Sequence, residues 1–306
     1  MKTDILIHGD SIEIVKMFPD DSVHAIISDI PYGIGFDDWD ILHDNKNSAY
    51  GGTSPAQISG GGIFKRRGKP LNGWSEADKK IPLEYQNWCS KWANDWLRIL
   101  KPGGTCFIFA GRRYAHRCII ALEDSGFTFK DMLAWEKCNA PHRAQRLSNI
   151  YERRNDLIHA KEWEDWRVAN LRPLFEPILW FQKPYKIGGT IADNILEYEI
   201  GAWNENALKK YNSHDEFCSN IIKVKVSQDD HGLHIAQKPL NLMKFLISLV
   251  TKEEQIVLDP FMGSGTTCVA AKHLKRHYIG VDIEADNIEI TKTRLNLPKQ
   301  IEIPLY

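Results

Sequence analysis

Four consecutive residues near the start of the chain, Asp29-Ile30-Pro31-Tyr32, combine groups that could hold a planar amine. The Asp29 carboxylate and the Ile30 carbonyl can accept hydrogen bonds from an exocyclic amino group, and the Tyr32 ring can stack on the base that carries it. The mostly apolar run 23–27 predicts a buried strand, and Pro31, which has no N–H, ends its hydrogen-bond ladder. The motif predicts a base-binding site at a strand end, although an ordinary turn could have similar residues.

A second candidate site lies near the other end of the chain, where 256–267 predict a strand, a tight turn and the start of a helix. Gly263 and Gly265 let the backbone approach a ligand, and the following helix offers unpaired N–H groups. Asp282 ends the next strand, at the spacing from which an acidic residue holds ribose hydroxyls. The third glycine of the dinucleotide fingerprint is missing, so a nicotinamide dehydrogenase is disfavoured.

The periodicity of apolar residues predicts the elements that position these sites. We expect strands over 5–8, 23–29, 105–110, 132–135, 178–181, 256–259 and 278–282, and helices over 11–18, 82–100, 112–126, 240–250, 266–275 and 285–295. Trp88, Trp92 and Trp96 fall on one side of the helix 82–100 and predict a core face, and the Lys-Pro-Gly-Gly segment 101–104 ends that helix. This alternation predicts an α/β fold with a doubly wound, mostly parallel sheet.

Three polar segments interrupt the pattern. Residues 36–82 predict a long flexible loop, with a basic run at 65–69 that could close over a phosphate backbone or be only a solvated insert. Residues 139–172 are polar, net basic and interleaved with aromatic rings, which fits either a nucleic-acid face or an ordinary solvated surface. Residues 183–230 predict a second irregular stretch.

Composition limits the class of protein. The 306 residues, 43% of them hydrophobic, suffice for one large domain or for a domain plus a small one. No apolar run is long enough for a membrane span, and the N-terminus lacks the pattern of a signal peptide. The six cysteines are scattered, so we expect no metal site and no disulfide framework, and a cytoplasmic location. With a net charge of −1, a nucleic-acid binder would need its basic groups on one face.

The order of several motifs carries a family resemblance. Asp29-Ile30-Pro31-Tyr32 is similar to a catalytic tetrad, Asp259–Thr266 to a cofactor loop, and His234-Ile235-Ala236-Gln237-Lys238-Pro239 to a His-Pro-Thr-Gln-Lys-Pro segment. Leu100–Gly104 and Trp135-Glu136-Lys137 fit further family positions. The chain resembles the S-adenosylmethionine-dependent DNA amino-methyltransferases of the beta group, in which the tetrad precedes the cofactor loop. It departs from their pattern at Ile30, which replaces a proline, and at 235–236.

The resemblance implies a Rossmann-like methyltransferase sheet, S-adenosylmethionine as cofactor and no metal. It implies that Asp29 and the Ile30 carbonyl hold the target amine, that Pro31 stiffens the loop and that Tyr32 stacks on a flipped base. It implies cofactor binding by Asp259, Phe261, Gly263, Ser264, Gly265, Thr266, Asp282 and Lys238. Within that set, Asp282 would bind the ribose, Asp259 would lie near the amino group of the methionine part, and Lys238 would pair with its carboxylate.

The resemblance also implies an organisation of the chain. Residues 1–182 would form the catalytic part, 183–230 the target-recognition insert with help from 139–172, and 231–306 the cofactor-binding part of the same domain. Double-stranded DNA is the expected partner in a bacterial or phage-type cytoplasm, and a homodimer and a companion restriction endonuclease are left open.

The first tetrad residue predicts the target base. In the family Asp goes mostly with N6 of adenine and Ser with N4 of cytosine, so Asp29 favours adenine, while Ser28 leaves a shifted alignment and cytosine N4 as the alternative. A cytosine-C5 enzyme is disfavoured because the chain has no Pro-Cys pair. Methylation of RNA or of a protein, and an inactive DNA-binding homologue, are further alternatives.

Overall fold

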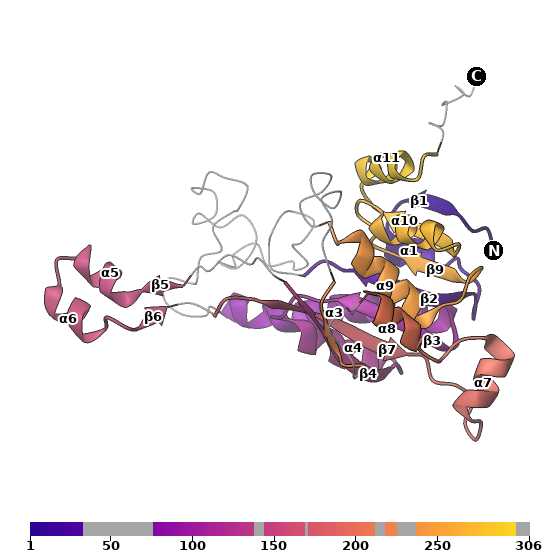
Figure 1. The fold of residues 1–306 in the computed structure, drawn as a ribbon, viewed down its shortest axis with the longest axis horizontal. Coiled ribbons are helices and arrows are strands. Elements are labelled where there is room, and N and C mark those ends of the chain that lie inside the picture. Colours follow the sequence, from indigo (N-terminus) through magenta and orange to yellow (C-terminus); the bar gives the residue numbers. More distant parts are fainter. Residues whose placement is uncertain (33–75, 138–143, 169–170, 212–217, 225–236, 298–306) are drawn as a thin grey trace.

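The computed structural model describes residues 1–32, 76–137, 144–168, 171–211, 218–224 and 237–297. Within these residues the fold is built on an eight-stranded sheet, in the order β1-β10-β9-β2-β3-β7-β4-β8 (Figure 1). The strands are β1 (Ile5–His8), β10 (His277–Asp282), β9 (Ile256–Asp259), β2 (Val23–Asp29), β3 (Leu100–Phe109), β7 (Phe175–Gln182), β4 (Thr128–Glu136) and β8 (Ile221–Ile222).

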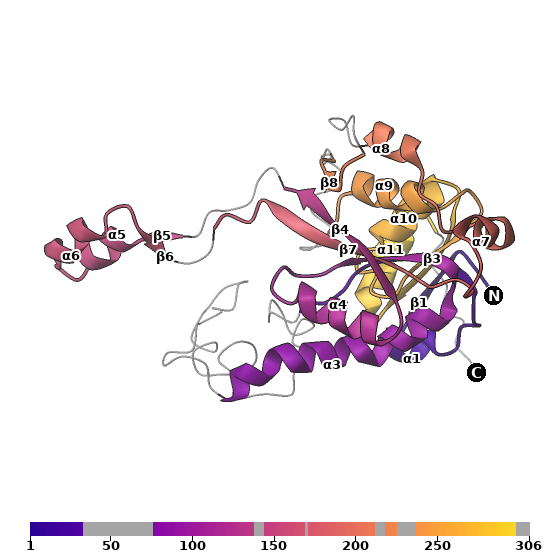
Figure 2. The same cartoon turned by 90° about the horizontal axis from the view of Figure 1, so that it is seen from below.

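Helices cover both faces of the sheet, which is why the central strands are almost continuously apolar. One face packs on α1 (Ser11–Val15), α3 (Glu76–Ile99) and α4 (Ala115–Asp124). The other packs on α8 (Glu205–Tyr211), α9 (Leu240–Val250), α10 (Thr266–His273) and α11 (Ala285–Arg294) (Figure 2). No helix among the described residues is long and apolar enough to cross a membrane. The predicted α/β, doubly wound and mostly parallel sheet is confirmed.

The order of the strands places the two candidate sites side by side. β2 pairs in parallel with β3 on one side and with β9 on the other, although β2 and β9 lie far apart in the sequence. Asp29 is the last residue of β2 and Asp259 the last residue of β9, so both lie at the carboxyl edge of the sheet. Open α/β sheets bind their ligands at this edge, where the strand order reverses.

Strand β7 is the exception to the parallel arrangement. It runs antiparallel to both β3 and β4, with Ile178 opposite Phe109 and Glu176 opposite Trp135. An antiparallel strand begins at the edge where its parallel neighbours end. The first residues of β7, including Glu176, therefore lie at the same edge as Asp29.

Several expected boundaries were wrong. The helix expected over 82–100 begins at Glu76 and ends at Ile99, so Pro82 lies inside α3 and the end of the loop expected over 36–82 is helical. Segment 101–104 belongs to β3 and does not form a separate helix stop. The irregular stretch expected over 183–230 contains α7 (Ile191–Tyr198), α8 and β8. Residues 33–75 of the loop lie outside the described part of the chain.

The aromatic stripe of α3 forms core, as the spacing predicted. Trp92 and Trp96 are buried, and their ring centroids lie 4.1 Å apart. Trp88 packs on Trp92 edge to face and also meets Phe261 of the cofactor loop, 5.7 Å between centroids. The stripe thus connects α3 to the loop after β9.

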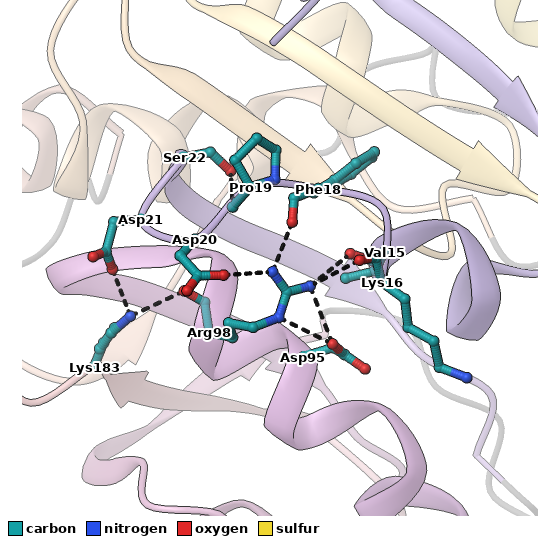
Figure 3. Close-up of polar contacts among 10 residues, drawn as sticks. All are labelled: Val15, Lys16, Phe18, Pro19, Asp20, Asp21, Ser22, Asp95, Arg98 and Lys183. Atoms are coloured by element: carbon teal, nitrogen blue, oxygen red, sulfur yellow. Dashed lines mark hydrogen bonds and ion pairs between the residues drawn. The ribbon is translucent and has the colours of Figure 1, made fainter.

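Arg98, on the last turn of α3, ties α1 and the following turn to the rest of the fold (Figure 3). Its guanidinium donates to the carbonyls of Val15, Lys16 and Phe18, at 3.2, 3.3 and 2.7 Å. It also pairs with Asp20 and Asp95. Lysine could not reach so many acceptors, since only guanidinium presents a planar set of five donors. This junction lies before β2 and so fixes where β2 enters the sheet.

An arm projects from the sheet between β4 and β7 (Figures 1 and 2). It consists of β5 (Gln145–Arg146), α5 (Leu147–Glu152), α6 (Leu157–Glu162) and β6 (Arg167–Val168), and β5 pairs with β6. By contrast, the described residues of 183–224 include side chains that pack on the body of the fold. Asn194 donates to the carbonyls of Pro102 and Ile200, and Ala207 and Leu208 are buried.

Candidate active site

The end of β2 separates two neighbouring polar residues. Ser28 is fully buried and donates its hydroxyl hydrogen bond to Asp259 Oδ1, at 2.7 Å. Asp29, next in the chain, faces the opposite side of the strand because successive residues alternate. Its carboxylate contacts Tyr32 and Lys238. Asp29, and not Ser28, therefore presents its side chain to the cluster of polar groups at the sheet edge.

Two side chains, Tyr32 and Lys238, contact the carboxylate of Asp29, and Glu176 and Lys137 extend the cluster beyond them. The Tyr32 hydroxyl lies 2.9 Å from Asp29 Oδ1 and 2.6 Å from Glu176 Oε1, so these oxygens compete for its single hydrogen. Lys238 Nζ pairs with Asp29 Oδ2, donates to the Tyr32 oxygen at 3.2 Å and lies 3.3 Å from Glu176 Oε1. The Lys137 ammonium pairs with the second oxygen of Glu176.

Burial and charge set the protonation of this cluster. Burial raises the pKa of Asp29, Lys238 opposes that rise, and Glu176 adds to it. Burial would also raise the pKa of Glu176, but the Lys238 and Lys137 ammonium groups lower it to about 2. Burial would lower the pKa of Lys238, and the two carboxylates raise it above its ordinary value. The pKa of Glu176 is thus lowered and that of Asp29 raised, so Asp29 is the better base of the two.

The loop that carries Tyr32 is held from two sides. Tyr85 of α3 donates its hydroxyl hydrogen bond to the Pro31 carbonyl, at 3.2 Å, and the Ile30 side chain is buried in the core. Gly111 follows β3 and packs on the Tyr32 side chain so closely that an added Cβ would lie 3.0 Å from two of its carbons. The buried Ile30 side chain anchors the loop where the family pattern has a proline.

The cofactor loop is tied to the end of β10. Gly263 and Gly265 both have positive φ angles, +50° and +74°, which favour glycine. Asp282 Oδ2 accepts from the Gly263 N–H at 2.8 Å, while Oδ1 accepts from Glu284 N–H and from Asn287, at 2.9 and 3.0 Å. These bonds hold the Asp282 carboxylate beside the glycine turn.

Asp259 lies beneath this loop. Its carboxylate accepts from Thr267 at 2.6 Å, from Ser28 at 2.7 Å and from the Phe261 N–H at 3.2 Å. Burial raises the pKa of Asp259 to about 7 in spite of these donors. Asp259 therefore connects β9, β2 and the start of α10, and fixes the turn above it.

The remaining predicted cofactor residues belong to the same loop. Arg294 of α11, which the sequence did not single out, donates to the Ser264 carbonyl at 2.6 Å and to the Thr266 hydroxyl at 2.9 Å. Phe261 packs on Trp88 and Trp96. The loop is thus closed from α11 on one side and from α3 on the other.

Lys238 is the predicted residue that the structure places differently. The sequence expectation put its ammonium on the carboxylate of the methionine part of the cofactor, but the structure puts it on Asp29, Tyr32 and Glu176. Glu176 was missed altogether, and Lys137 was noted only as part of the segment 135–137, without a role in the site. The only sequence signal for Glu176 is an acidic residue at the start of an apolar strand, and its importance depends on the direction of β7.

Comparison with known proteins agrees with this geometry. A family model described as DNA methylase, for N6 and N4 methyltransferases, matches residues 23–293, which include both ends of the site. The chain belongs to this family of DNA methylases. It is 61% identical over 298 residues to the type II methyltransferase M.HindIII of Haemophilus influenzae, covering 97% of this chain and 96% of that one.

More distant proteins share the fold. The type II methyltransferase M.HpaI of Haemophilus parainfluenzae is 26% identical and is matched over 74% of its length, against 95% of this chain. The solved structure of the cytosine-N4-specific PvuII DNA methyltransferase has a TM-score of 0.58 at 16% identity, with 99% of this chain and 89% of that one covered. M1.HpyAVI in complex with its cofactor (SAM) has a TM-score of 0.54 at 24% identity, covering 95% and 98%.

Proposed function

We propose that this DNA methyltransferase transfers the methyl group of S-adenosylmethionine to the exocyclic N6 of an adenine that has left the duplex. The observation that carries the proposal is the position of the Asp29 carboxylate at the end of β2, one strand from the glycine turn after β9. The Ser28 hydroxyl, which the cytosine alternative would need, is fully buried and donates to Asp259.

The cofactor loop fits S-adenosylmethionine. A Cβ built on Gly263 would meet no atom of the described residues within 4 Å, so space for a ligand lies over the glycine turn. Asp282 keeps carboxylate lone pairs beside that turn for ribose hydroxyls. S-adenosylmethionine, when bound, supplies a methyl group on a positively charged sulfur. The protein then has to position the acceptor nitrogen and to stabilise its developing positive charge.

The residues around Asp29 supply both functions. An adenine in the helix hides its amine in a base pair, so the base must first be extruded. The Tyr32 ring offers a stacking surface worth about 1–3 kcal/mol. Asp29 and the Ile30 carbonyl then accept hydrogen bonds from the two N–H groups of the amine, which aims the nitrogen lone pair at the methyl group. Asp29 receives the proton that N6 releases as the new N–C bond forms, so the methylated base leaves neutral.

The test is transfer of labelled methyl groups to unmethylated DNA of mixed sequence, followed by mass analysis of the nucleosides. Label in N6-methyladenine is the expected result. Label in N4-methylcytosine would keep the enzyme class and overturn the base, and the shared fold of the cytosine-N4-specific PvuII enzyme makes this the main competitor. If the protein binds the cofactor but transfers no label to DNA, the assignment of DNA as substrate is overturned. Label on RNA or on a protein would then identify the substrate class, and label on neither would indicate an inactive homologue.

We further infer that the arm contacts the DNA. A hollow at its base is lined by Arg146, Arg153 and Arg167, together with the polar side chains Gln145 and Asn149. All three arginines are exposed, and clustered guanidinium groups bind phosphate oxygens. The arm leaves the body at the end of β4 and rejoins it at the start of β7 (Figure 2). The strand pairings place this edge of the sheet on the same side as Asp29. We therefore assign more of the recognition to 139–172 than the sequence analysis did, and a share for 183–230 stays a prediction.

We expect Arg146→Gln combined with Arg167→Gln to weaken DNA binding by about 10-fold at moderate salt and to lower the slope of log affinity against log salt by about 2. The control replaces Lys252 and Lys275 by Gln, since both are exposed, are paired with glutamates and precede β9 and β10 at the opposite edge. Fluorescence anisotropy with labelled DNA at several salt concentrations measures the affinity and the salt slope of each variant. An unchanged salt slope in the arm variant would show that the arm does not bind phosphates.

A further inference from the structure

Glu176 is a buried carboxylate in the site for which the reaction proposed above gives no role. Only 7% of its surface is exposed, and it enters the site from β7, the antiparallel strand. It meets Tyr32 and Lys238 through one oxygen and Lys137 through the other. A buried anion with two cationic partners is costly to assemble, which indicates a function beyond packing.

Four of the side chains here are charged, two carboxylates and two ammonium groups. Lys238 lies between Asp29 and Glu176, and Lys137 neutralises Glu176 from the far side. The phenol of Tyr32 bridges the same two carboxylates, and burial raises its pKa well above its ordinary value, so it stays neutral. Two negative and two positive charges therefore balance.

The position of Lys238 conflicts with the task of Asp29. The ammonium occupies Asp29 Oδ2, an oxygen that a target amine would need as its acceptor. An ammonium held there would also repel the positive charge that develops on the nitrogen during methyl transfer. Lys238 must therefore give up this oxygen before the reaction, and Glu176 Oε1 lies only 3.3 Å from its Nζ.

We propose that Glu176 is a positioning residue that takes the Lys238 ammonium from Asp29 when the target amine arrives. The hand-over needs little movement, because Nζ already lies within ion-pair distance of both carboxylates. It keeps Lys238 paired, so no buried charge is stranded, and it leaves Asp29 open to accept the amine and then the proton. This role rests on the proposed function of Asp29.

The test is Glu176→Gln, which keeps the size of the side chain and an oxygen acceptor for Tyr32 but removes the charge. Among the residues that the structure describes, Lys238 then keeps Asp29 as its one anionic partner. We expect kcat to fall about 10- to 100-fold with KM for S-adenosylmethionine and for DNA nearly unchanged. Glu176 raises the pKa of Asp29, so its loss moves the acidic limb of the kcat profile to lower pH.

The groups facing Glu176 allow a sharper test with Lys238→Met. This variant leaves Asp29 beside Glu176 without a cation between them, so the acidic limb moves to higher pH. In the double variant Lys238→Met with Glu176→Gln, one charge of each sign is gone. We expect its acidic limb to return toward the wild-type position and its kcat to exceed that of Glu176→Gln alone.

Glu136→Gln is the matched control, because Glu136 is the last residue of β4, is half exposed and pairs with Lys223 at 3.1 Å. Its kcat and the acidic limb of its kcat profile should match those of the wild type. The hand-over would be overturned if the kcat losses of the two single variants multiplied in the double variant. It would also be overturned if Glu176→Gln lowered kcat without moving the acidic limb of its pH profile. In either case Glu176 would only support Tyr32. Absence of methyl transfer by the wild type in the same assay would instead overturn the proposed function. If Glu176→Gln fails to fold, the pH profile of Lys238→Met and of the double variant still tests the hand-over.

Discussion

Asp29→Ala should lower kcat for methyl transfer by about 10²- to 10⁴-fold, the range set by loss of a base and of charge stabilisation together. The variant loses the acceptor of the target amine and the group that receives its proton. The affinity for S-adenosylmethionine should stay within about 2-fold, since the contacts of the cofactor loop come from Asp282 and Arg294 and not from Asp29. Single-turnover transfer of label and calorimetry of cofactor binding measure the two effects separately.

The control for this variant is Asp21→Ala. Asp21 also pairs with a lysine, Lys183 at 2.6 Å, but it precedes β2 and lies at the other end of that strand (Figure 3). Its loss should leave kcat within about 2-fold, as exposed ion pairs contribute little. An Asp29→Ala enzyme that retains near-wild-type kcat would show that the methylated nitrogen is held by other groups.

Asp282→Ala should weaken S-adenosylmethionine binding by about 100-fold, equivalent to about 2.7 kcal/mol. The substitution removes the acceptor of the Gly263 N–H and the acceptor shared by the Glu284 N–H and the Asn287 amide, so it releases the glycine turn as well as the ribose. Hydrogen bonds to charged groups contribute about 1.5–3 kcal/mol each. Calorimetric titration with S-adenosylmethionine measures the loss, and thermal unfolding shows whether the sheet survives.

Two further variants test whether the effect is specific to the Asp282 carboxylate. Asp286→Ala removes an exposed carboxylate from the first turn of α11 and should leave the affinity nearly unchanged. Asp282→Asn keeps the shape but weakens the acceptors, and should fall between wild type and alanine. Equal affinities of Asp282→Ala and wild type would mean that the cofactor binds without touching the end of β10.

The sequence was sufficient to predict the sheet and the positions of Asp29, Asp259 and Asp282 at the ends of strands, because these depend on local patterns. A covered parallel strand is a short apolar run, and the polar residue that ends it lies at the sheet edge wherever the strand is placed. This is why Asp29, Asp259 and Asp282 could be placed before the structure was known. The boundaries of α3 were less predictable, since Pro82 lies inside the helix and Leu100 begins a strand at once.

The partners of Asp29 were not predictable, because they depend on tertiary packing and not on local sequence patterns. Glu176 reaches Asp29 only because β7 runs antiparallel, and periodicity does not reveal the direction of a strand. Lys238 precedes α9, and whether its long side chain turns to the cofactor or to Asp29 depends on the charges that β7 and β4 bring together. The separation of arm and body also depends on how 139–172 and 183–230 pack, which is a tertiary property.

The pairing of β2 with β9 has a consequence for biosynthesis. When β2 and β3 have left the ribosome and paired, the other edge of β2 still waits for β9; the bond from Ser28 to Asp259 spans 231 residues. Until then an apolar strand edge is open to aggregation, and contacts of such long range form slowly. Under the proposed function, a growing chain gains activity only after β9 and the loop that follows it are made, because Asp29 ends β2 and Asp259 ends β9. A chain that stops before β9 would leave this edge of β2 unpaired and the Ser28 hydroxyl without Asp259, so we expect it to lack methyl transfer.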